Sequence, residues 1–417
     1  MKPTKLEPAT GTQPGASKRV LLAYSGGLDT SFLVAWLVRE LECEVSAVYV
    51  DCGGLGAGER EEIAARALEL GAGEFRVLDG RAALWEGVLR WLLAGNVRRG
   101  GVYPLSVGAE RGVQVQLLAE LARAEGFDAL AHGCTAAGND QVRFEAALAV
   151  LAPDLEVLAP VRDLGKSREE QLAWLAEQGL PAPPAGGRYS INAGLWGQTI
   201  GGGELLDSHE ALPEAGWVWT RGGGGEAQLR LDFEAGQPRA IDGRSLAPVE
   251  LVEALNHLGA QRGVGRGYHL GDTVLGIKGR IAFEAPAAEI LLAAHRELEK
   301  LVLTEEQRFW KDHLGDVYGR RLHQGLLHDP FMRDVEAFLG SSQQVVSGCV
   351  HLELANGRVQ VTGVESPFSM LAASDAAYGE RAASGADPRA AAFLGRVLAE
   401  PARLAAVARA AGEGGAS

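Results

Sequence analysis

Short apolar runs alternate with amphipathic segments from Val20 to about Pro160. Each run has the length of a β-strand, and this alternation is typical of a parallel sheet flanked by helices. The predicted strands are Val20–Ala23, Val45–Val50, Phe75–Leu78, Ala129–Ala131 and Glu156–Leu158. The first part of the chain is therefore predicted to be an α/β domain.

Three amphipathic segments between and after these runs predict helices. Apolar residues recur at helical spacing from Phe32 to Leu41, so the first helix is expected to pack one face on the sheet. A second helix is predicted at Val113–Glu125. A third begins at Ser167, whose spacing from Glu170 predicts a capping box.

The alternation of strands and helices ends near residue 180, where the sequence becomes "LPAPPAGGRYS". Beyond it, "QLRLDF" alternates as a strand, and Asn356-Gly357 lies between two alternating segments, which predicts a hairpin. The segment "AEILLAAHRELEKLVL" predicts a helix whose apolar face belongs either to the core or to a subunit interface. The predicted organisation is a loose tail (1–18), a nucleotide-binding domain (19–180), a second α+β domain (181–385) and a C-terminal helical tail (386–417).

The amino-acid composition makes several classes of protein improbable for this chain. The 417 residues are 47% hydrophobic and carry a net charge of -14, which disfavours binding to a nucleic acid. No segment approaches the roughly 18 consecutive apolar residues of a membrane span. The four cysteines show no zinc or redox spacing and fit a reducing environment, so we expect a cytoplasmic protein.

The turn in "AYSGGLDTS" joins the first strand to the first helix and predicts an anion site. Backbone N–H groups and the positive end of the helix point there, and the hydroxyls of Ser25, Thr30 and Ser31 lie nearby in the sequence. The segment lacks both the lysine-containing phosphate loop and the dinucleotide fingerprint. Asp29 suggests a Mg²⁺ ion between the acid and phosphates. The alternative is an ordinary turn in which Asp29 caps the helix.

Later segments give this loop a family context. "AYSGGLDTS", "YPL" at Tyr103–Leu105, "AHGCT" followed by "GNDQVRFE" at Ala131–Glu145, "GIKGR" at Gly276–Arg280 and "FEAPAAEILLAAHRELE" at Phe283–Glu299 occur in this order. Together they resemble the argininosuccinate synthase family of ATP pyrophosphatases. The resemblance implies a Rossmann-like nucleotide-binding domain, a second α+β synthetase domain and a C-terminal helical segment that builds a homotetramer.

The resemblance also implies a reaction: a C–N bond-forming ligase that joins citrulline to aspartate through a citrullyl-adenylate, using ATP and Mg²⁺. The residues it implies for ATP are Ala23, Tyr24, Ser25, Gly26, Gly27, Leu28, Asp29, Thr30, Ser31 and Gly133, with Asp29 as the Mg²⁺ ligand. Those it implies for aspartate are Thr135, Asn139 and Asp140, and those for citrulline are Tyr103, Asn139, Arg143, Ser190, Thr199, Gly271 and Phe283. Ser25, Asp29 and Asp140 are the catalytic residues expected from it.

Simpler roles exist for several of these residues. Without the family, Arg143 is expected to pair with Glu145 or a neighbouring helix, and Asp140 is expected to cap a helix. His132 and Cys134 are expected to be structural.

Departures from the family pattern lie on the citrulline side. Gly271 occupies the position of a usual glutamate and Phe283 that of a usual tyrosine, while Asn192, Gly194 and Gln198 replace an Asp, an Asn and an Arg, and Ala137 replaces a lysine. An alternative is that Asp272, beside Gly271, takes over the glutamate's contact with an ammonium group through a one-residue shift of the loop. Two enzyme hypotheses follow: an argininosuccinate synthase, or a paralogous ligase that adenylates another ureido or amide group before an amine attacks. A tRNA-thiolating enzyme would need a cysteine pair and a basic surface, and a protein that only binds nucleotide would be expected to have a damaged loop.

Overall fold

The computed structural model describes residues 17–56, 58–136, 138–184, 187–220, 224–373 and 388–414. Most of the predicted N-terminal tail, Ala137, and residues 386, 387 and 415–417 of the predicted C-terminal tail lie outside these ranges. Contacts divide the chain into two units, Met1–Phe368 and Ser369–Ser417, and each is described by itself.

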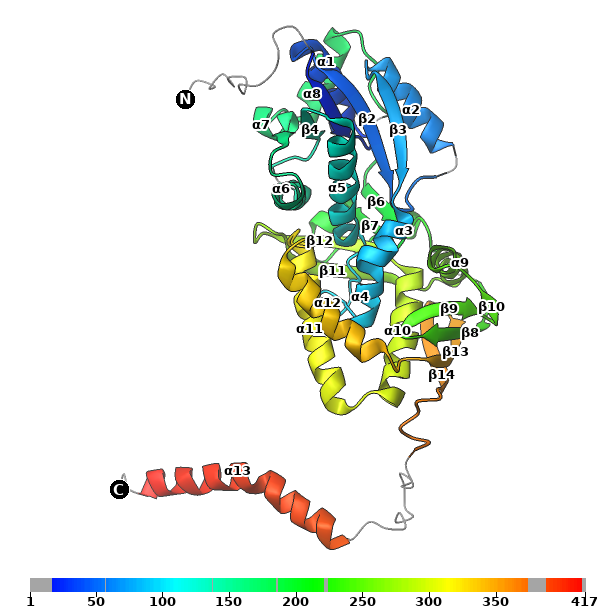
Figure 1. The fold of residues 1–417 in the computed structure, drawn as a ribbon, viewed down its shortest axis with the longest axis vertical. Coiled ribbons are helices and arrows are strands. Elements are labelled where there is room, and N and C mark those ends of the chain that lie inside the picture. The colour runs from blue at the N-terminus through cyan, green and yellow to red at the C-terminus, as the bar shows by residue number, and fades with distance from the viewer. Residues whose placement is uncertain are drawn as a thin grey trace. The chain divides into compact units, whose positions relative to one another are not determined.

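The five apolar runs form one parallel sheet in the order β3-β2-β1-β4-β5 (Figure 1). Its strands are β1 (Arg19–Ala23), β2 (Glu44–Asp51), β3 (Glu74–Asp79), β4 (Ala129–His132) and β5 (Glu156–Leu158). The predicted strands are confirmed to within about one residue at each end. Val20 of β1 pairs with Val45 of β2 and Ala129 of β4, so the strand order reverses beside β1. Ligands of open α/β sheets bind at the carboxyl edge of such a reversal.

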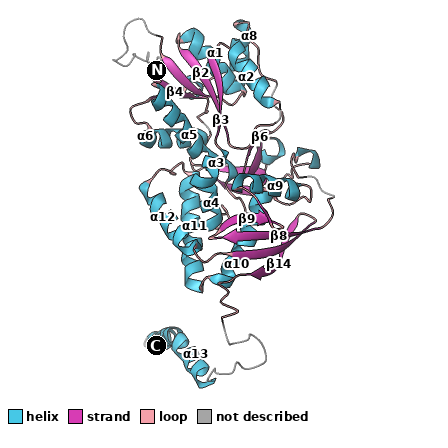
Figure 2. Cartoon of the chain, turned by 45° about the vertical axis from the view of Figure 1, so that its right-hand side comes forward, coloured by secondary structure: helices cyan, strands magenta, loops and turns pink. Residues whose placement is uncertain are grey.

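Helices cover both faces of this sheet (Figure 2). They are α1 (Leu28–Glu40), α2 (Glu59–Glu69), α5 (Ser106–Glu125), α6 (Asp140–Leu151), α7 (Pro160–Leu164) and α8 (Arg168–Glu177). Successive side chains of β1 point to opposite faces of the sheet, which explains why helices pack on both faces. Val20 and Leu22 belong to a buried cluster with Phe32 of α1. Leu21 belongs to another cluster with Val113 of α5. The capping box of α8 is confirmed: the Glu170 amide donates to Ser167 Oγ, and the Ser167 amide donates to Glu170 Oε2.

Helix α5 begins at Ser106, seven residues before the predicted start at Val113. Its first two turns are "SVGAERG", and this glycine-rich segment lacks a clear apolar period. The small residues serve close packing instead: a Cβ added at Gly112 would lie 2.6 Å from Leu327 Cδ2. Tertiary packing therefore stabilises helical turns that the local sequence pattern does not predict.

The region after residue 187 holds two antiparallel sheets. One has the order β10-β9-β8-β13-β14 and comprises β8 (Ala227–Glu234), β9 (Gln237–Ile241), β10 (Arg244–Ser245), β13 (Gly348–Ala355) and β14 (Arg358–Glu365). The other has the order β11-β12-β7-β6 and comprises β6 (Ser190–Gly194), β7 (Gly197–Gly201), β11 (Arg266–Asp272) and β12 (Lys278–Glu284). The predicted hairpin joins β13 to β14, and both Asn356 and Gly357 have positive φ.

Helices α9 (Pro248–Ala260), α10 (Pro286–Val302), α11 (Glu305–His323) and α12 (Pro330–Gln343) belong to the same region. The apolar face of α10 lies in the core, since Ile290, Leu291 and Leu298 are fully buried. Of the two roles left open for this face, the core is the one observed. Short 3₁₀ turns occupy Gly203–Leu206 and Glu214–Gly216.

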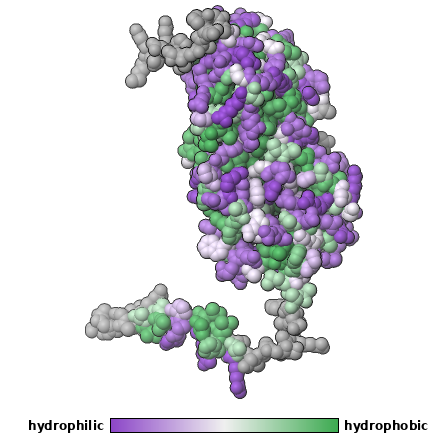
Figure 3. Space-filling model, in the orientation of Figure 1, coloured by the Kyte–Doolittle hydropathy of each residue, from purple (hydrophilic) through white to green (hydrophobic). Residues whose placement is uncertain are grey.

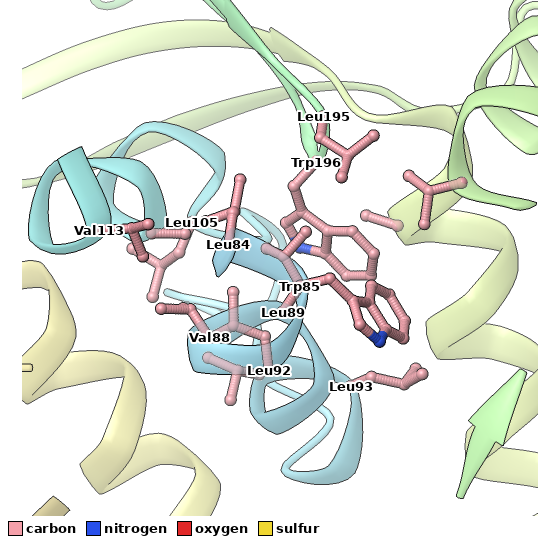
Figure 4. Packing of buried hydrophobic residues seen from close by; sticks show 14 of the residues in the cluster. Leu84, Trp85, Val88, Leu89, Leu92, Leu93, Leu105, Val113, Leu195 and Trp196 are labelled. Atoms are coloured by element: carbon pink, nitrogen blue, oxygen red, sulfur yellow. The ribbon is translucent and has the colours of Figure 1, made fainter. Parts of the chain in front are cut away.

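A helical segment comprising α3 (Arg81–Leu84), a π-turn (Trp85–Leu89) and α4 (Arg90–Ala94) links the parallel sheet to this second region. Figure 4 shows its leucines and Trp85 packing against Leu195 and Trp196 from the turn between β6 and β7. Trp196 Nε1 also donates a hydrogen bond to the carbonyl of Pro104 over 3.1 Å. One apolar cluster thus fixes the second region against the carboxyl edge of the first sheet.

The C-terminal unit holds α13 (Pro388–Gly414), which contains Pro401. Its apolar side chains are exposed (Figure 3). They include Phe393, Leu394, Val397, Leu398, Leu404 and Val407. Among the described residues, no helix has the length and apolar character needed to cross a membrane.

Candidate functional site

The turn between β1 and α1 forms one wall of a cleft. Gly26 has φ of +77°, and a Cβ there would lie 2.9 Å from Ile63 Cγ1, so both the conformation and the space favour glycine. Ser25 Oγ lies 3.2 Å from Thr30 Oγ1 across the turn. The backbone amide of Ser31 donates to the Gly27 carbonyl. The three amides that precede it in α1 belong to the first turn of the helix, so no carbonyl within the helix can accept their hydrogen bonds. These amides and the helix dipole favour an anion.

Asp29 lies in the first turn of α1 and lines the cleft. It is not the helix cap, because Gly27 occupies that position and no side chain caps it. Gln171 of α8 donates from Nε2 to Asp29 Oδ1 over 2.9 Å, and its side chain is only 1% exposed. Gln171 fixes the carboxylate beside the anion-binding turn. Its position was not predicted, since it is 142 residues away in the sequence.

The cleft has a volume of about 850 Å³ and brings together most of the residues expected from the sequence. Those that line it are Ala23, Tyr24, Ser25, Gly27, Asp29, Thr30, Tyr103, Gly133, Thr135, Asn139, Asp140, Arg143, Ser190, Thr199 and Gly271. Gly26, Leu28, Ser31 and Phe283 are buried and are not among its lining residues. Gly26, Leu28 and Ser31 therefore shape the turn from behind.

Asp140 is held between two arginines at the centre of the cleft. Arg111 Nε lies 2.9 Å from Asp140 Oδ2, and Arg143 Nη1 lies 2.8 Å from Asp140 Oδ1. Burial alone would raise the pKa of Asp140, but the two guanidinium groups lower it below its ordinary value. Asp140 is therefore a carboxylate at neutral pH. The cap of α6 is Asn139. The expected Arg143–Glu145 pair is wrong, because Glu145 pairs with Arg162, whereas the alternative contact with a neighbouring helix is confirmed: Arg143 Nε donates to the His323 carbonyl at the end of α11.

Phe283 supports the cleft without lining it. Its ring centroid lies 5.3 Å from that of Tyr103, and its side chain is 4% exposed. The strand pairing of β12 with β11 and β7 turns this side chain under Tyr103 and against Gly267. The expectation that Phe283 contacts a substrate directly is corrected accordingly.

Three further residues gather around Tyr103 and Gly271, and no sequence motif predicted them. His269 stacks on Tyr103 with ring centroids 5.6 Å apart, and a Cβ on Gly271 would lie 2.4 Å from His269 Nε2. Arg99 Nη2 donates to the Asp272 carbonyl over 2.5 Å. His323 accepts from Arg143 Nη2 at its Nδ1 over 3.0 Å, and burial lowers the pKa of His323 to about 3, so the ring is neutral.

Glu110 of α5 is a buried carboxyl on the cleft wall. Burial raises its pKa to about 8, and the charge of Arg111 opposes that shift only in part. Its Oε1 atom has no hydrogen-bond partner among the described residues. Glu110 is therefore mostly protonated at neutral pH.

A second cluster of possible metal ligands lies outside the cleft, on the sheet of β13 and β14. Cys349, His351 and Glu365 place their ligand atoms within 4.8 Å of one another. However, His351 Nε2 already lies 3.1 Å from Glu365 Oε1, and the positive charge of Arg230 acts on Cys349. The four cysteines are free thiols.

The doubly wound sheet, the anion-binding turn and the cleft define a nucleotide-binding α/β protein with a second, substrate-facing region. Two family models match it: "Arginosuccinate synthase N-terminal HUP domain" over residues 19–181 and "Arginosuccinate synthase C-terminal domain" over residues 189–394. The chain belongs to the argininosuccinate synthase family, as its motifs predicted.

Similar proteins come from several organisms. The argininosuccinate synthase of Xanthomonas campestris pv. campestris is 41% identical over 375 residues, covering 88% of this chain and 93% of the relative. That of Methanocaldococcus jannaschii is 35% identical over 364 residues, covering 87% and 92%. That of Dictyoglomus thermophilum is 37% identical over 356 residues, covering 85% and 89%. Of the two enzyme hypotheses, these matches favour an argininosuccinate synthase over a paralogous ligase.

Proposed function

We propose that the protein is an argininosuccinate synthase, a ligase that uses ATP to join citrulline to aspartate and releases pyrophosphate and AMP. The observation that carries this proposal is the continuity of the cleft. The anion-binding turn, the Asp140–Arg143 pair and Gly271 line the same cavity, so nucleotide, amine donor and acceptor can meet in it.

At the nucleotide end, the turn would hold the pyrophosphate part of ATP. The free amides of α1 and the hydroxyls of Ser25 and Thr30 would donate to its oxygens, and this stabilisation grows as charge collects on the leaving pyrophosphate. Asp29 fits a Mg²⁺ ligand, since its carboxylate lines the cleft beside the turn and Gln171 fixes its orientation. Bound Mg²⁺ would supply Lewis-acid stabilisation of the phosphate charge.

At the centre, Thr135, Asn139 and Asp140 would hold aspartate. The Asn139 side-chain oxygen accepts from the Val274 amide over 2.7 Å, which leaves its NH₂ group to donate to a carboxylate. Asp140, kept ionised by its two arginines, would attract the amino group of aspartate. Holding that amine next to the adenylated carbon is the positioning step.

On the acceptor side, Tyr103, Arg143, Ser190, Thr199 and Gly271 would surround citrulline. Phe283 would act through Tyr103, whose ring it supports. We further propose a cytoplasmic homotetramer in which α13 contributes to assembly, because its apolar side chains are exposed.

The test of the reaction is the order of product formation. With Mg-ATP, citrulline should release pyrophosphate, and AMP with an aspartate adduct should appear only when aspartate follows. Release of pyrophosphate by another ureido compound but not by citrulline would contradict the proposal. Asp29→Asn should lower the rate about 100-fold, whereas Glu120→Gln on the outer face of α5 serves as a matched control.

A further inference from the structure

The acceptor end of the cleft is bordered by Arg99, Tyr103, His269, Gly271, Asp272 and His323. These residues form one connected set. Arg99 and Tyr103 exchange backbone hydrogen bonds of 2.7 and 3.0 Å, and the Tyr103 ring stacks on His269. Arg99 also donates to the Asp272 carbonyl.

Charge at this end is unbalanced toward the positive. Asp140 pairs with both Arg111 and Arg143, so one carboxylate faces two guanidinium groups, and Asp272 pairs with Lys278, whose Nζ lies 2.7 Å from Asp272 Oδ1. Arg99 pairs with no carboxylate among the described residues, and its Nη1 is buried there without a hydrogen-bond partner. The guanidinium therefore brings to the cleft a positive charge that forms no ion pair among the described residues, although the charge of Asp272 acts on it.

The two imidazoles do not change this balance. Burial, with the charge of Arg99, lowers the pKa of His269, and burial, with Arg143 and Arg99, lowers that of His323. Both rings are neutral at pH 7, and the His269 ring fills the space into which a side chain at position 271 would project. Among the described residues, this end of the cleft offers no unpaired carboxylate to an ammonium group.

We propose that the acceptor end recognises its substrate as an anion: Arg99 binds the carboxylate of a ureido acid, and the site does not read the α-amino group. The acceptor class is then ureido carboxylic acids, of which citrulline is one member. This inference rests on the proposed function, because it concerns the acceptor of that reaction. Arg99 is a specificity-determining residue in this scheme.

Two acceptors, each lacking one group of citrulline, test the recognition of the carboxylate and of the amino group separately. 5-Ureidopentanoate keeps the carboxylate of citrulline and lacks the amino group, whereas N-carbamoylputrescine keeps the amino group and lacks the carboxylate. In pyrophosphate release with Mg-ATP, 5-ureidopentanoate should have kcat/KM within about threefold of citrulline or above it, and N-carbamoylputrescine about 100-fold below it. A loss of more than about 30-fold with 5-ureidopentanoate would overturn the inference.

The variant Arg99→Ala tests the residue. It should raise KM for citrulline and 5-ureidopentanoate about 10- to 100-fold while leaving KM for ATP and aspartate unchanged. The matched control is Arg98→Ala, since Arg98 is the preceding residue and pairs with Glu289 of α10. It should keep all KM values within about twofold.

The outcomes separate this inference from the proposed function. If citrulline releases pyrophosphate but Arg99→Ala leaves its KM within about twofold, the inference is wrong and the function stands. If none of the three acceptors releases pyrophosphate with the wild-type protein, the proposed function fails, and the inference fails with it. A general loss of structure in Arg99→Ala would raise KM for ATP as well as for the acceptor. In that case the variant Arg99→Lys, which keeps the charge, should show part of the wild-type affinity for the acceptor.

Discussion

Gln171 reaches from α8 to Asp29 at the start of α1, and its Nε2 donates to Asp29 Oδ1 over 2.9 Å. Gln171 is held in turn by the Lys166 carbonyl, which accepts from the same nitrogen over 3.3 Å. The two helices pack together through Phe32 and Trp174, whose ring centroids are 5.2 Å apart. The orientation of the Asp29 carboxylate beside the turn is thus set by α8, and Gln171 in that helix lies 142 residues after Asp29 in the sequence.

The first prediction concerns this contact. Gln171→Met keeps the side-chain length and removes the donor, so Asp29 should lose its fixed orientation. We expect kcat to fall about tenfold and the Mg²⁺ concentration for half-maximal rate to rise, measured by pyrophosphate release. Gln178→Met, at the C-cap position just after the same helix, should change neither. Equal effects of the two substitutions would contradict a positioning role for Gln171.

The second prediction concerns pH and the buried carboxyl of Glu110. Burial raises its pKa from 4.5 to about 8, so the folded chain keeps a proton that the unfolded chain releases. The stability that this proton contributes is present below pH 4.5 and is lost as pH rises toward 8. Glu110→Gln should therefore gain about 4 kcal/mol of unfolding free energy over wild type at pH 8, and almost none at pH 4.5. Urea unfolding at the two pH values measures it, and a gain of the same size at both would refute the buried-acid explanation.

The third prediction tests the close approach of His269 to Gly271. A methyl added by Gly271→Ala would meet His269 Nε2 at 2.4 Å, so the imidazole must move from its stack on Tyr103, and the substitution should destabilise the fold by about 1 kcal/mol. Gly279→Ala, on the paired strand, adds the same methyl at 3.6 Å from Thr273 and should be nearly neutral. The double variant His269→Ala with Gly271→Ala should recover part of the loss. Thermal unfolding of the four proteins is the measurement, and no recovery in the double variant would rule out the imidazole as the obstacle.

The fourth prediction concerns α13. A chain ending at Phe368 retains the whole first unit with its own cores, so it should fold. Because the exposed apolar side chains of α13 are removed, light scattering should report a smaller assembly than the full chain forms. Replacing Leu394 and Leu398 by Asp in the full chain should have the same effect. An unchanged mass in both cases would exclude α13 from the assembly.

Local patterns predicted the elements whose signals are contained in a few neighbouring residues. The strand of Val20–Ala23, the Ser167–Glu170 capping box and the Asn356-Gly357 hairpin are all confirmed. Each depends on an apolar run or on a short motif with a defined backbone conformation. The early start of α5 and the packing of α11 and α12 were not predicted, because long-range contacts decide them.

The sequence by itself determined the family, the anion-binding turn and the identity of most residues that line the cleft. Only the tertiary structure decided how those residues are paired. It joined Gln171 to Asp29 and Arg111 to Asp140, turned Phe283 beneath Tyr103, and brought Arg99 to the cleft with its Nη1 unpartnered among the described residues. The physical reason is that a motif specifies residue types and local backbone geometry, whereas burial, charge balance and side-chain orientation depend on contacts between segments far apart in the chain.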